Sequence, residues 1–187
     1  MSRVNFGAKP FIYPMPVLII GSYGKDGTPD AMNAAWGGIS ESSEISICVG
    51  DNHKTTENIL ARKAFTVSIA DVDNLIAADY VGIVSANNIP DKIAKAGWHT
   101  SKSDLVDAPL FEELPLCLEC KLKSYDKESC RMVGEIVNVC ADERILDKNG
   151  KIDLLKFRPI TYNPDANTYV VLGETVGKAF SDGKNIK

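Results

Sequence analysis

The sequence lacks a basic stripe and has no excess of positive charge. Its 21 lysines and arginines are interspersed with 25 acidic residues, which gives a net charge of −4 and a pI near 5.2. Affinity for a nucleic-acid backbone requires clustered positive charge. The composition therefore argues against a nucleic-acid partner.

The sequence also lacks a long apolar run. Residues 1–7 have no uninterrupted hydrophobic stretch of the signal-peptide kind, and no later run approaches the roughly 20 apolar residues of a membrane span. Five cysteines, an odd number, are scattered through predicted strands, which favours buried reduced thiols over a secreted disulfide framework. We expect a soluble cytoplasmic protein with no membrane partner.

A third absence concerns nucleotide binding. The chain contains no Gly-x-Gly-x-x-Gly sequence, which excludes a dinucleotide fold with its phosphate at the first strand–helix turn. With 187 residues and 44% hydrophobic side chains, the chain can bury one sizeable core. We therefore expect a single domain over residues 1–187 that holds any phosphate by other means.

The first half is typical of short strands joined by tight turns. Val17–Ile20 is apolar throughout and predicts a strand buried on both faces. Gly24–Gly27 predicts a hairpin turn, because Asp-Gly readily adopts positive φ. The return strand is predicted over Asp30–Trp36, and alternating apolar residues over 45–49 predict a half-buried third strand.

Helices are expected between the further strands. A short helix is predicted from Thr55 or Thr56, with a threonine as its N-cap, to about Lys63. Phe65–Ile69 is rich in β-forming residues and predicts a fourth strand. The remaining predictions are a helix over 71–79, a loop over the core at 80–87 and a second helical candidate over 89–96.

The second half begins a new β section. Alternation over 116–123 predicts a strand with one buried and one polar face, and 131–140 predicts its hairpin partner. A turn is predicted at Asp147–Gly150 and a last strand at Thr168–Gly173. Antiparallel strands, tight turns and few helices together predict a small β-barrel with helical caps, a mainly β fold with inserted helices.

Two stretches form the candidate binding site. Residues 27–36 are mostly small and end in Trp36, so their backbone can approach a flat ligand. Residues 51–59 place hydroxyls and positive charge at a helix start, where free N–H groups and the helix dipole favour an anion. The two stretches indicate a pocket for a phosphate-bearing aromatic cofactor. The alternative for the helix start is an ordinary threonine-capped surface helix.

A series of short motifs follows one order along nearly the whole chain. They are Pro14-x-Pro16-Val17, Asp26-Gly27-x-Pro29-Asp30-Ala31-Met32-Asn33-Ala34-Ala35-Trp36-Gly37-Gly38, Lys54-Thr55-Thr56-x-Asn58-Ile59, Phe65-Thr66-Val67-Ser68-Ile69, Asp79-Tyr80-Val81-Gly82-x-Val84-Ser85, Asp91-Lys92, Ala108-Pro109-Leu110, Leu118-Glu119-Cys120 and Val133-Gly134-Glu135-Ile136. No single motif is highly specific, but the ordered series resembles the flavin reductase-like FMN-binding split-barrel family, in particular its flavoredoxin-like branch.

The resemblance implies a split β-barrel that binds FMN and forms a homodimer. The flavin ring would lie along the strand that contains Ala31, Met32, Asn33, Ala34, Ala35 and Trp36. The phosphate would lie at His53, Lys54, Thr55 and Thr56. With the flavin near the subunit interface, a covering loop would bring Ser85, Asn87 and Lys92 toward it.

The resemblance also implies an FMN-dependent oxidoreductase. It would be a flavin reductase or a flavoredoxin-like electron carrier, supplied with electrons by NAD(P)H or a redox protein. Because the flavin supplies the redox chemistry, no catalytic side chain is expected. The alternative, from a different class, is a non-catalytic flavin- or ligand-binding dimeric module.

Three positions depart from the family pattern. Asp30 stands where asparagine is usual and is expected in a turn or a dimer contact. Asn33 stands where threonine or serine is common, and its amide can still hydrogen-bond a flavin. Cys130 stands where many relatives with reductase activity carry histidine, which argues against efficient NAD(P)H-dependent reduction.

Other chemistry-bearing residues have simpler interpretations. Cys117-x-x-Cys120 lies in a predicted strand, where this spacing points the two side chains to opposite faces, so core thiols are favoured over a metal or redox site. His99 follows in a polar loop with no carboxylate or nucleophile placed beside it by the sequence, which favours a surface or interface role. Tyr162 and Tyr169 are expected in core or dimer packing.

Overall fold

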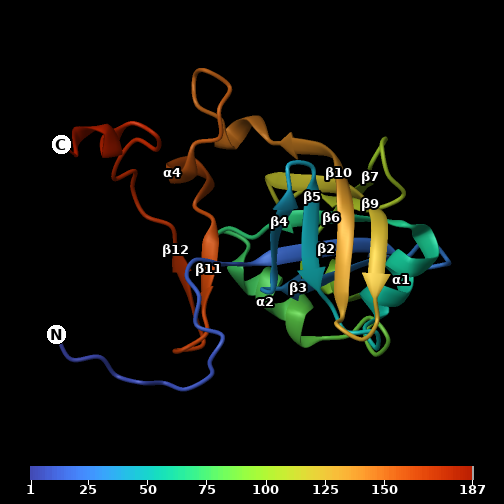
Figure 1. Ribbon diagram of the computed structural model, residues 1–187. Helices are drawn as coiled ribbons and strands as arrows, with labels where there is room; N and C mark the ends of the chain where they lie inside the picture. Colours follow the sequence, from blue (N-terminus) through green and yellow to red (C-terminus); the bar gives the residue numbers. More distant parts are fainter. Residues whose placement is uncertain (187) are drawn as a thin grey trace.

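A seven-stranded antiparallel sheet dominates the computed structural model, which describes residues 1–186 (Figure 1). The sheet curls into a half-barrel with the strand order β3-β2-β6-β9-β10-β5-β4. The strands are β2 (Leu18–Tyr23), β3 (Pro29–Ala34), β4 (Gly37–Glu41), β5 (Glu44–Cys48), β6 (Ala64–Ile69), β9 (Leu116–Asp126) and β10 (Arg131–Ala141). Strands β3 and β4 are its two edges.

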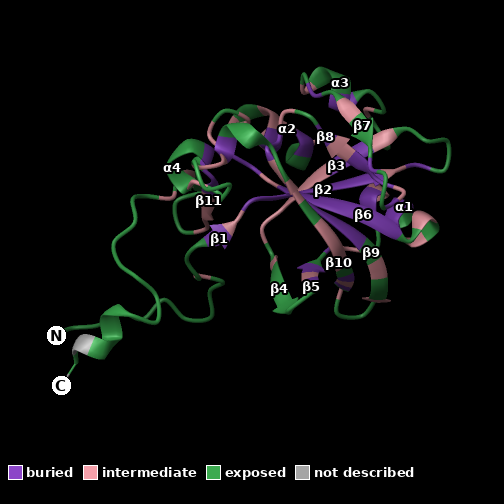
Figure 2. Cartoon of the chain, turned by 90° about the horizontal axis from the view of Figure 1, so that it is seen from above, coloured by how far each residue is buried: buried purple, intermediate pink, exposed green. Residues whose placement is uncertain are grey.

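Smaller elements cover and extend this sheet. A three-stranded sheet joins β1 (Met15–Pro16), β11 (Ile160–Asn163) and β12 (Thr168–Val171), and a hairpin joins β7 (Thr100–Lys102) to β8 (Pro109–Phe111). The α-helices are α1 (Lys54–Arg62), α2 (Leu75–Ile83), α3 (Lys92–Lys95) and α4 (Leu154–Phe157), with 3-10 turns at η1 (Glu143–Ile145) and η2 (Asp182–Asn185). Both chain ends extend from the sheet as exposed arms (Figure 2). Among residues 1–186, no helix combines the length and the apolar character needed to span a membrane.

The strand predicted at Val17–Ile20 is confirmed as part of a strand buried on both faces. Val17 and Ile19 belong to one core cluster, while Leu18 and Ile20 belong to the cluster on the opposite face of the sheet. The turn predicted at Gly24–Gly27 follows the end of β2, and Gly27 has a φ of 85°. Strand β2, which is buried along most of its length, therefore contacts a core on each face of the sheet (Figure 2).

The strand predicted over 45–49 is confirmed as β5, but it is the second arm of a hairpin whose first strand, β4, was not predicted. Strand β4 is an exposed edge strand that opens with Gly37 and Gly38, and it therefore carries little apolar alternation. Helix α2 runs to Ile83, so half of the predicted loop at 80–87 is helical, whereas the candidate over 89–96 shrinks to the four residues of α3.

The predicted hairpin of β9 and β10 is confirmed, but the second face of β9 is exposed only from Lys121 onward. Leu118 and Cys120 face the cluster that also contains Leu18 and Ile20, called the inner core below, as predicted. Cys117 and Glu119 on the other face are also buried. The segment around β7 and β8 covers them: Ser103 donates a hydrogen bond to Glu119. The alternation of apolar and polar residues predicts which face of β9 meets the inner core, but it does not reveal that another segment covers the opposite face at Glu119.

Substitution Gly134→Ala in β10 is expected to destabilise the fold by about 1–3 kcal/mol, because it overpacks the inner core. A Cβ atom at Gly134 would lie 2.3 Å from Cζ of Phe65, a ring that is completely buried. Gly38→Ala in β4 is the matched control, since its Cβ would meet no atom within 4 Å. Urea denaturation measures both, and equal stability of the two variants would contradict this account of the core.

Candidate functional site

Four cavities lie along β3, the edge strand of the large sheet, and the two residues that follow it. The helix-end cavity, of about 310 Å³, is lined by Asp30 and Met32 of β3 together with residues at the start of α1 and the end of α2. The tyrosine cavity, of about 390 Å³, takes Asn33 and Ala35 from the same stretch. The arm groove, of about 970 Å³, lies beside the N-terminal arm and is also lined by Ala35 and Trp36. Residues between Asp30 and Trp36 therefore contribute to the lining of every one of these cavities.

The helix-end cavity contains the N-terminus of α1. The first intrahelical hydrogen bond runs from the Glu57 N–H to the His53 carbonyl, at 3.2 Å. The N–H groups of Lys54, Thr55 and Thr56 precede it and are not used within the helix. Helix α1 has nine residues, and the free N–H groups and the positive end of its dipole make its N-terminus a favourable place for an anion.

The threonine N-cap predicted for this helix is wrong. His53 is the N-cap, and its side chain makes no capping hydrogen bond. The Thr55 hydroxyl donates to Asp30 Oδ2 at 2.7 Å, and the Thr56 hydroxyl donates to the Gly50 carbonyl at 2.7 Å. Both threonines are buried, so their hydroxyls tie the helix to neighbouring segments instead of closing its end.

A buried ion pair lies across the same cavity. Lys92 Nζ lies 2.9 Å from Asp30 Oδ1, and both side chains are only 3% exposed. Lys92 also donates to the Val84 carbonyl at 3.2 Å. Because the contact lies outside hydrogen-bond geometry, Oδ1 of Asp30 accepts no hydrogen bond from the residues that the structure describes. The turn expected for Asp30 is wrong, since Asp30 lies in β3 and its carboxylate pairs with Lys92 inside the helix-end cavity.

Lys54 adds a second, more exposed cation to the helix-end cavity. Its side chain is 28% exposed, and its Nζ lies 3.1 Å from Glu57 Oε2. An exposed lysine of this kind can turn toward an anion at small cost, whereas Lys92 is held in place by its partners. The cavity thus combines one fixed cation, one adaptable cation and a helix N-terminus.

The tyrosine cavity lies between α2 and the β11–β12 hairpin. Tyr169 donates a hydrogen bond to Asp79 Oδ1 at 2.7 Å, and burial, followed by this bond, raises the pKa of Tyr169 to about 12. Asn33 donates to the Ala78 carbonyl at 3.1 Å. Tyr162 and Tyr169 also pack against the core at a ring separation of 6.0 Å, which confirms the packing role expected for them.

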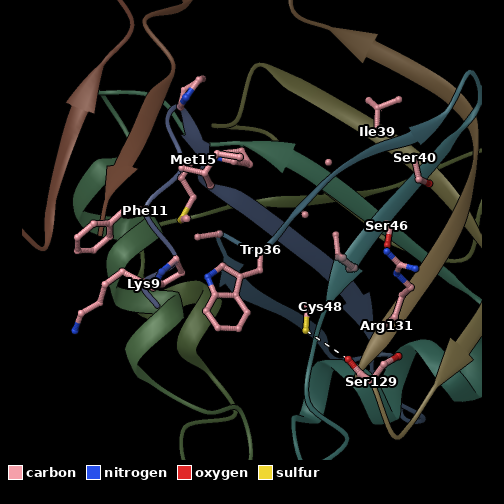
Figure 3. Close-up of a pocket in the computed structure, with 18 residues that line it drawn as sticks. Lys9, Phe11, Met15, Trp36, Ile39, Ser40, Ser46, Cys48, Ser129 and Arg131 are labelled. Carbon is pink, nitrogen blue, oxygen red and sulfur yellow. Dashed lines mark hydrogen bonds between the residues drawn. The ribbon is translucent and has the colours of Figure 1, made fainter. Parts of the chain in front are cut away.

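The arm groove lies between the N-terminal segment and the β4–β5 hairpin (Figure 3). Trp36 stands at its centre and is 59% exposed. Figure 3 shows Cys48 and Arg131 on the opposite wall, beyond the indole ring, and Lys9 and Phe11 on the wall made by the arm. A tryptophan this exposed, inside a large partly apolar groove, indicates a surface that a ligand or another chain covers.

The structure brings most of the sequence-predicted site residues to these cavities. Those that line the helix-end cavity are Met32, His53, Lys54, Thr55, Ser85 and Lys92. Asn33 and Ala35 line the tyrosine cavity, Trp36 lines the arm groove, and Asn87 lines a fourth cavity, of about 350 Å³, that Lys54 also lines. The side chains of Ala31, Ala34 and Thr56 line none of these cavities. Sequence reasoning missed Asp30 as a lining residue and the residues Val81, Gly82, Ile83, Val84 and Ala86.

His99 lies outside these cavities, with its side chain 78% exposed. Its Nδ1 is 2.7 Å from Glu113 Oε1, and hydrogen bonding to Glu113 raises the pKa of His99 above 6.5. The pair therefore stabilises the fold at pH values below about 6.5, and this contribution is lost as the pH rises through the folded-state pKa. The surface position expected for His99 is confirmed.

An NMR titration of the imidazole is expected to give a pKa for His99 above its ordinary value, because the charged ring is hydrogen-bonded. Glu113→Gln should return the pKa toward the ordinary value, while Glu112→Gln, which removes only a weaker charge effect, should lower it less. Equal shifts in the two variants would contradict the assigned pair.

Comparison with known proteins defines the family. Residues 11–167 match the family described as "Flavin reductase like domain". The fold is similar to that of flavoredoxin of Desulfovibrio vulgaris (Miyazaki F), with a TM-score of 0.93 and 35% identity over 97% of this chain and 100% of that one. It is also similar to flavoredoxin of Methanosarcina acetivorans, with a TM-score of 0.89 and 26% identity over 100% of both chains. The chain belongs to the flavin reductase-like family, in its flavoredoxin-like branch.

A more distant relative is a protein without an assigned activity. An uncharacterised protein of Aquifex aeolicus (strain VF5) is 27% identical over 111 residues, which are 57% of this chain and 55% of that protein. The chain thus aligns with about half the length of this relative. The half-barrel described above is the split β-barrel of the family, so the mainly β fold predicted from the sequence is confirmed.

Proposed function

We propose that the protein binds FMN and carries electrons through it as an oxidoreductase of the flavin reductase and flavoredoxin type. The FMN phosphate would lie in the helix-end cavity, and the flavin ring would follow β3 toward Trp36. The observation that carries the proposal is the N-terminus of α1, which opens beside Lys54 and Lys92 into a cavity lined by the edge strand β3. Family membership supports flavin as the ligand.

The helix-end cavity fits a phosphate group in its chemistry. The backbone N–H groups of Lys54, Thr55 and Thr56 would donate to phosphate oxygens, and the two lysines would supply positive charge. The Asp30 carboxylate opposes an anion, but Lys92 and the Thr55 hydroxyl already offset its charge. The hydroxyls of Thr55 and Thr56 would act as supports of the helix start, since both already donate within the protein.

The strand β3 fits the edge of a flavin ring. Its backbone is paired with β2 on one side only, so alternate N–H and C=O groups on the other side have no strand partner among residues 1–186. The small side chains of Ala34 and Ala35 let a flat ring come close to these groups. Asn33 would add an amide beside the ring, while Trp36 would cover its far end.

Bound FMN would supply the electron transfer, and the protein would supply position and electrostatics. The residues of this chain would hold the phosphate, orient the ring along β3 and exclude water from it with the end of α2. Ser85, next to that helix end, lines the helix-end cavity, and Asn87 lies in the cavity beside it. Electrons would come from NAD(P)H or from a redox protein, and Cys130 in the place of a family histidine favours the redox protein.

A homodimer would complete the ring site. Trp36 and Ile39 are 59% and 66% exposed, and β4 beside them is an unpaired sheet edge among residues 1–186. An exposed edge with apolar residues invites association. A second copy of the chain over the arm groove would cover both features, and light scattering at micromolar concentration should report the mass of a dimer.

The visible spectrum tests the proposed cofactor. Adding FMN to the protein should shift and structure the flavin absorption bands and quench flavin fluorescence, because the ring leaves water for an ordered site. Parallel additions of FAD and riboflavin identify which part of the cofactor is recognised. The absence of a spectral change with all three flavins would contradict the proposal. If a flavin binds but neither NAD(P)H nor a redox protein reduces it, the protein is a non-catalytic flavin-binding module.

A further inference from the structure

Two cysteines face each other across β9 and β10. Cys117 and Cys140 are paired directly in the antiparallel register of these strands. Two residues away, the Asp142 N–H donates to the Pro115 carbonyl at 2.8 Å, which marks a hydrogen-bonded pair. Because such pairs alternate along the ladder, Cys117 and Cys140 also form a hydrogen-bonded pair, with Cα atoms about 5.5 Å apart.

This separation suits a disulfide, whose Cα atoms usually lie about 4.4–6.8 Å apart. The Cys140 thiol lies over the partner residue, with its Sγ 3.6 Å from the Cys117 carbonyl oxygen. The two thiols are close enough that each shifts the pKa of the other. The pair is therefore close enough for a covalent link to form with a local adjustment of the ladder.

The surroundings of the pair differ from those of an ordinary core thiol. Ser68 on β6 lies opposite Cys117, and its buried hydroxyl has no hydrogen-bond partner among the described residues. Cys117 is buried, while Cys140 is half-buried and reachable from solvent. Cys120 points into the inner core, so Cys117-x-x-Cys120 is not the pair that the spacing suggested.

We propose that Cys117 and Cys140 form a reversible redox dithiol that hydrogen peroxide or a related two-electron oxidant converts to a cross-strand disulfide. The Cys140 thiolate would attack one peroxide oxygen, the O–O bond would break, and the leaving hydroxide would take a proton to form water. The resulting sulfenic acid of Cys140 would be attacked by Cys117, which forms the S–S bond and releases a second water. Two thiols are oxidised, and one peroxide is reduced to two waters.

The electrostatics assign the two roles. Hydrogen bonding to Cys117 lowers the pKa of Cys140 to about 7, although burial and the nearby Glu119 oppose this. Hydrogen bonding to Cys140, and then burial, raise the pKa of Cys117 well above its ordinary value. Cys140 is therefore the attacking thiolate near neutral pH, and Cys117 is the thiol that resolves its sulfenic acid.

The disulfide is expected to be easily reduced. Side chains of a hydrogen-bonded pair stand farther apart than those of a non-hydrogen-bonded pair, so closing an S–S bond here strains the ladder. Strained disulfides have higher, more oxidising potentials and are the labile ones. Dithiothreitol should therefore restore both thiols without unfolding the protein.

Thiol counting and peptide mapping test the proposal. After treatment with hydrogen peroxide, the thiols titrated in denaturant should fall by two, from five to three. Trypsin should then release peptide 103–121, which carries Cys117 and Cys120, joined to peptide 132–144, which carries Cys140. Cys140→Ser should abolish the link, while Cys120→Ala should keep it and so identify Cys117 as the partner.

Cys48→Ser is the matched control, because Cys48 is the exposed cysteine of the chain and lies far from the pair in the register. This variant should form the 103–121 to 132–144 link as the unaltered protein does. Oxidation without that link, whether at Cys48, between chains or only to single sulfenic or sulfinic acids, would overturn the proposal. Retention of all five thiols by a folded protein would overturn it as well.

Discussion

Replacing Lys92 with methionine is expected to weaken FMN binding by about tenfold to a hundredfold, because a charge-assisted contact contributes roughly 1.5–3 kcal/mol. The substitution removes the fixed cation of the helix-end cavity and leaves the Asp30 carboxylate facing the phosphate. Riboflavin has no phosphate, so its affinity should change far less. The FMN-to-riboflavin affinity ratio, measured by fluorescence titration, is therefore the informative quantity.

The same substitution should also destabilise the ligand-free protein by about 3–5 kcal/mol, since removing one member of a buried ion pair leaves an uncompensated charge. Lys95→Met is the matched control on the same short helix. Lys95 is 53% exposed and pairs only with the exposed Asp91, so its loss should alter neither the affinity ratio nor the urea midpoint appreciably. An unchanged FMN-to-riboflavin affinity ratio in Lys92→Met would show that the phosphate does not bind in the helix-end cavity.

Replacing Asp30 with asparagine is expected to act on affinity in the opposite direction. The amide removes the one carboxylate that lines the helix-end cavity, and Lys92 becomes free to neutralise a phosphate. We expect the FMN-to-riboflavin ratio to rise about tenfold. Without an anion, however, the protein should lose about 3–5 kcal/mol of stability, because Lys92 is then a buried cation with no acidic partner.

Thermal unfolding with and without FMN distinguishes the two effects of Asp30→Asn. Saturating FMN should restore a larger share of the lost stability than riboflavin does, because the phosphate takes the place of the carboxylate. Asp91→Asn is the control, since Asp91 is the exposed partner of Lys95. Equal rescue by the two flavins would mean that Lys92 does not face the phosphate.

The sequence predicted best the elements whose burial is uniform. Val17–Ile20 is apolar at every position because its alternate side chains pack into two cores on opposite faces of the sheet. Strand β4 could not be found in this way. It is exposed along most of its length and opens with two glycines, so neither alternation nor β-propensity distinguishes it from a loop.

Residue types at the site were predictable, whereas their hydrogen-bond partners were not. Thr55 and Thr56 at a helix start suggested phosphate donors, but the fold turns both hydroxyls inward. The ion pair of Asp30 and Lys92 joins two segments far apart in the chain, and no local pattern shows that they meet. The pairing of Cys117 with Cys140 likewise depends on the register of β9 against β10, which the spacing of the cysteines does not reveal.

The central claim is that a flavin phosphate is held at the start of α1 beside Lys92. Equilibrium titration of the unaltered protein with FMN and with riboflavin, in one buffer without phosphate, tests it most directly. The account predicts that FMN binds at least about tenfold more tightly than riboflavin and that the difference narrows at high salt, because part of it is electrostatic. Equal affinities for the two flavins at low salt would contradict it.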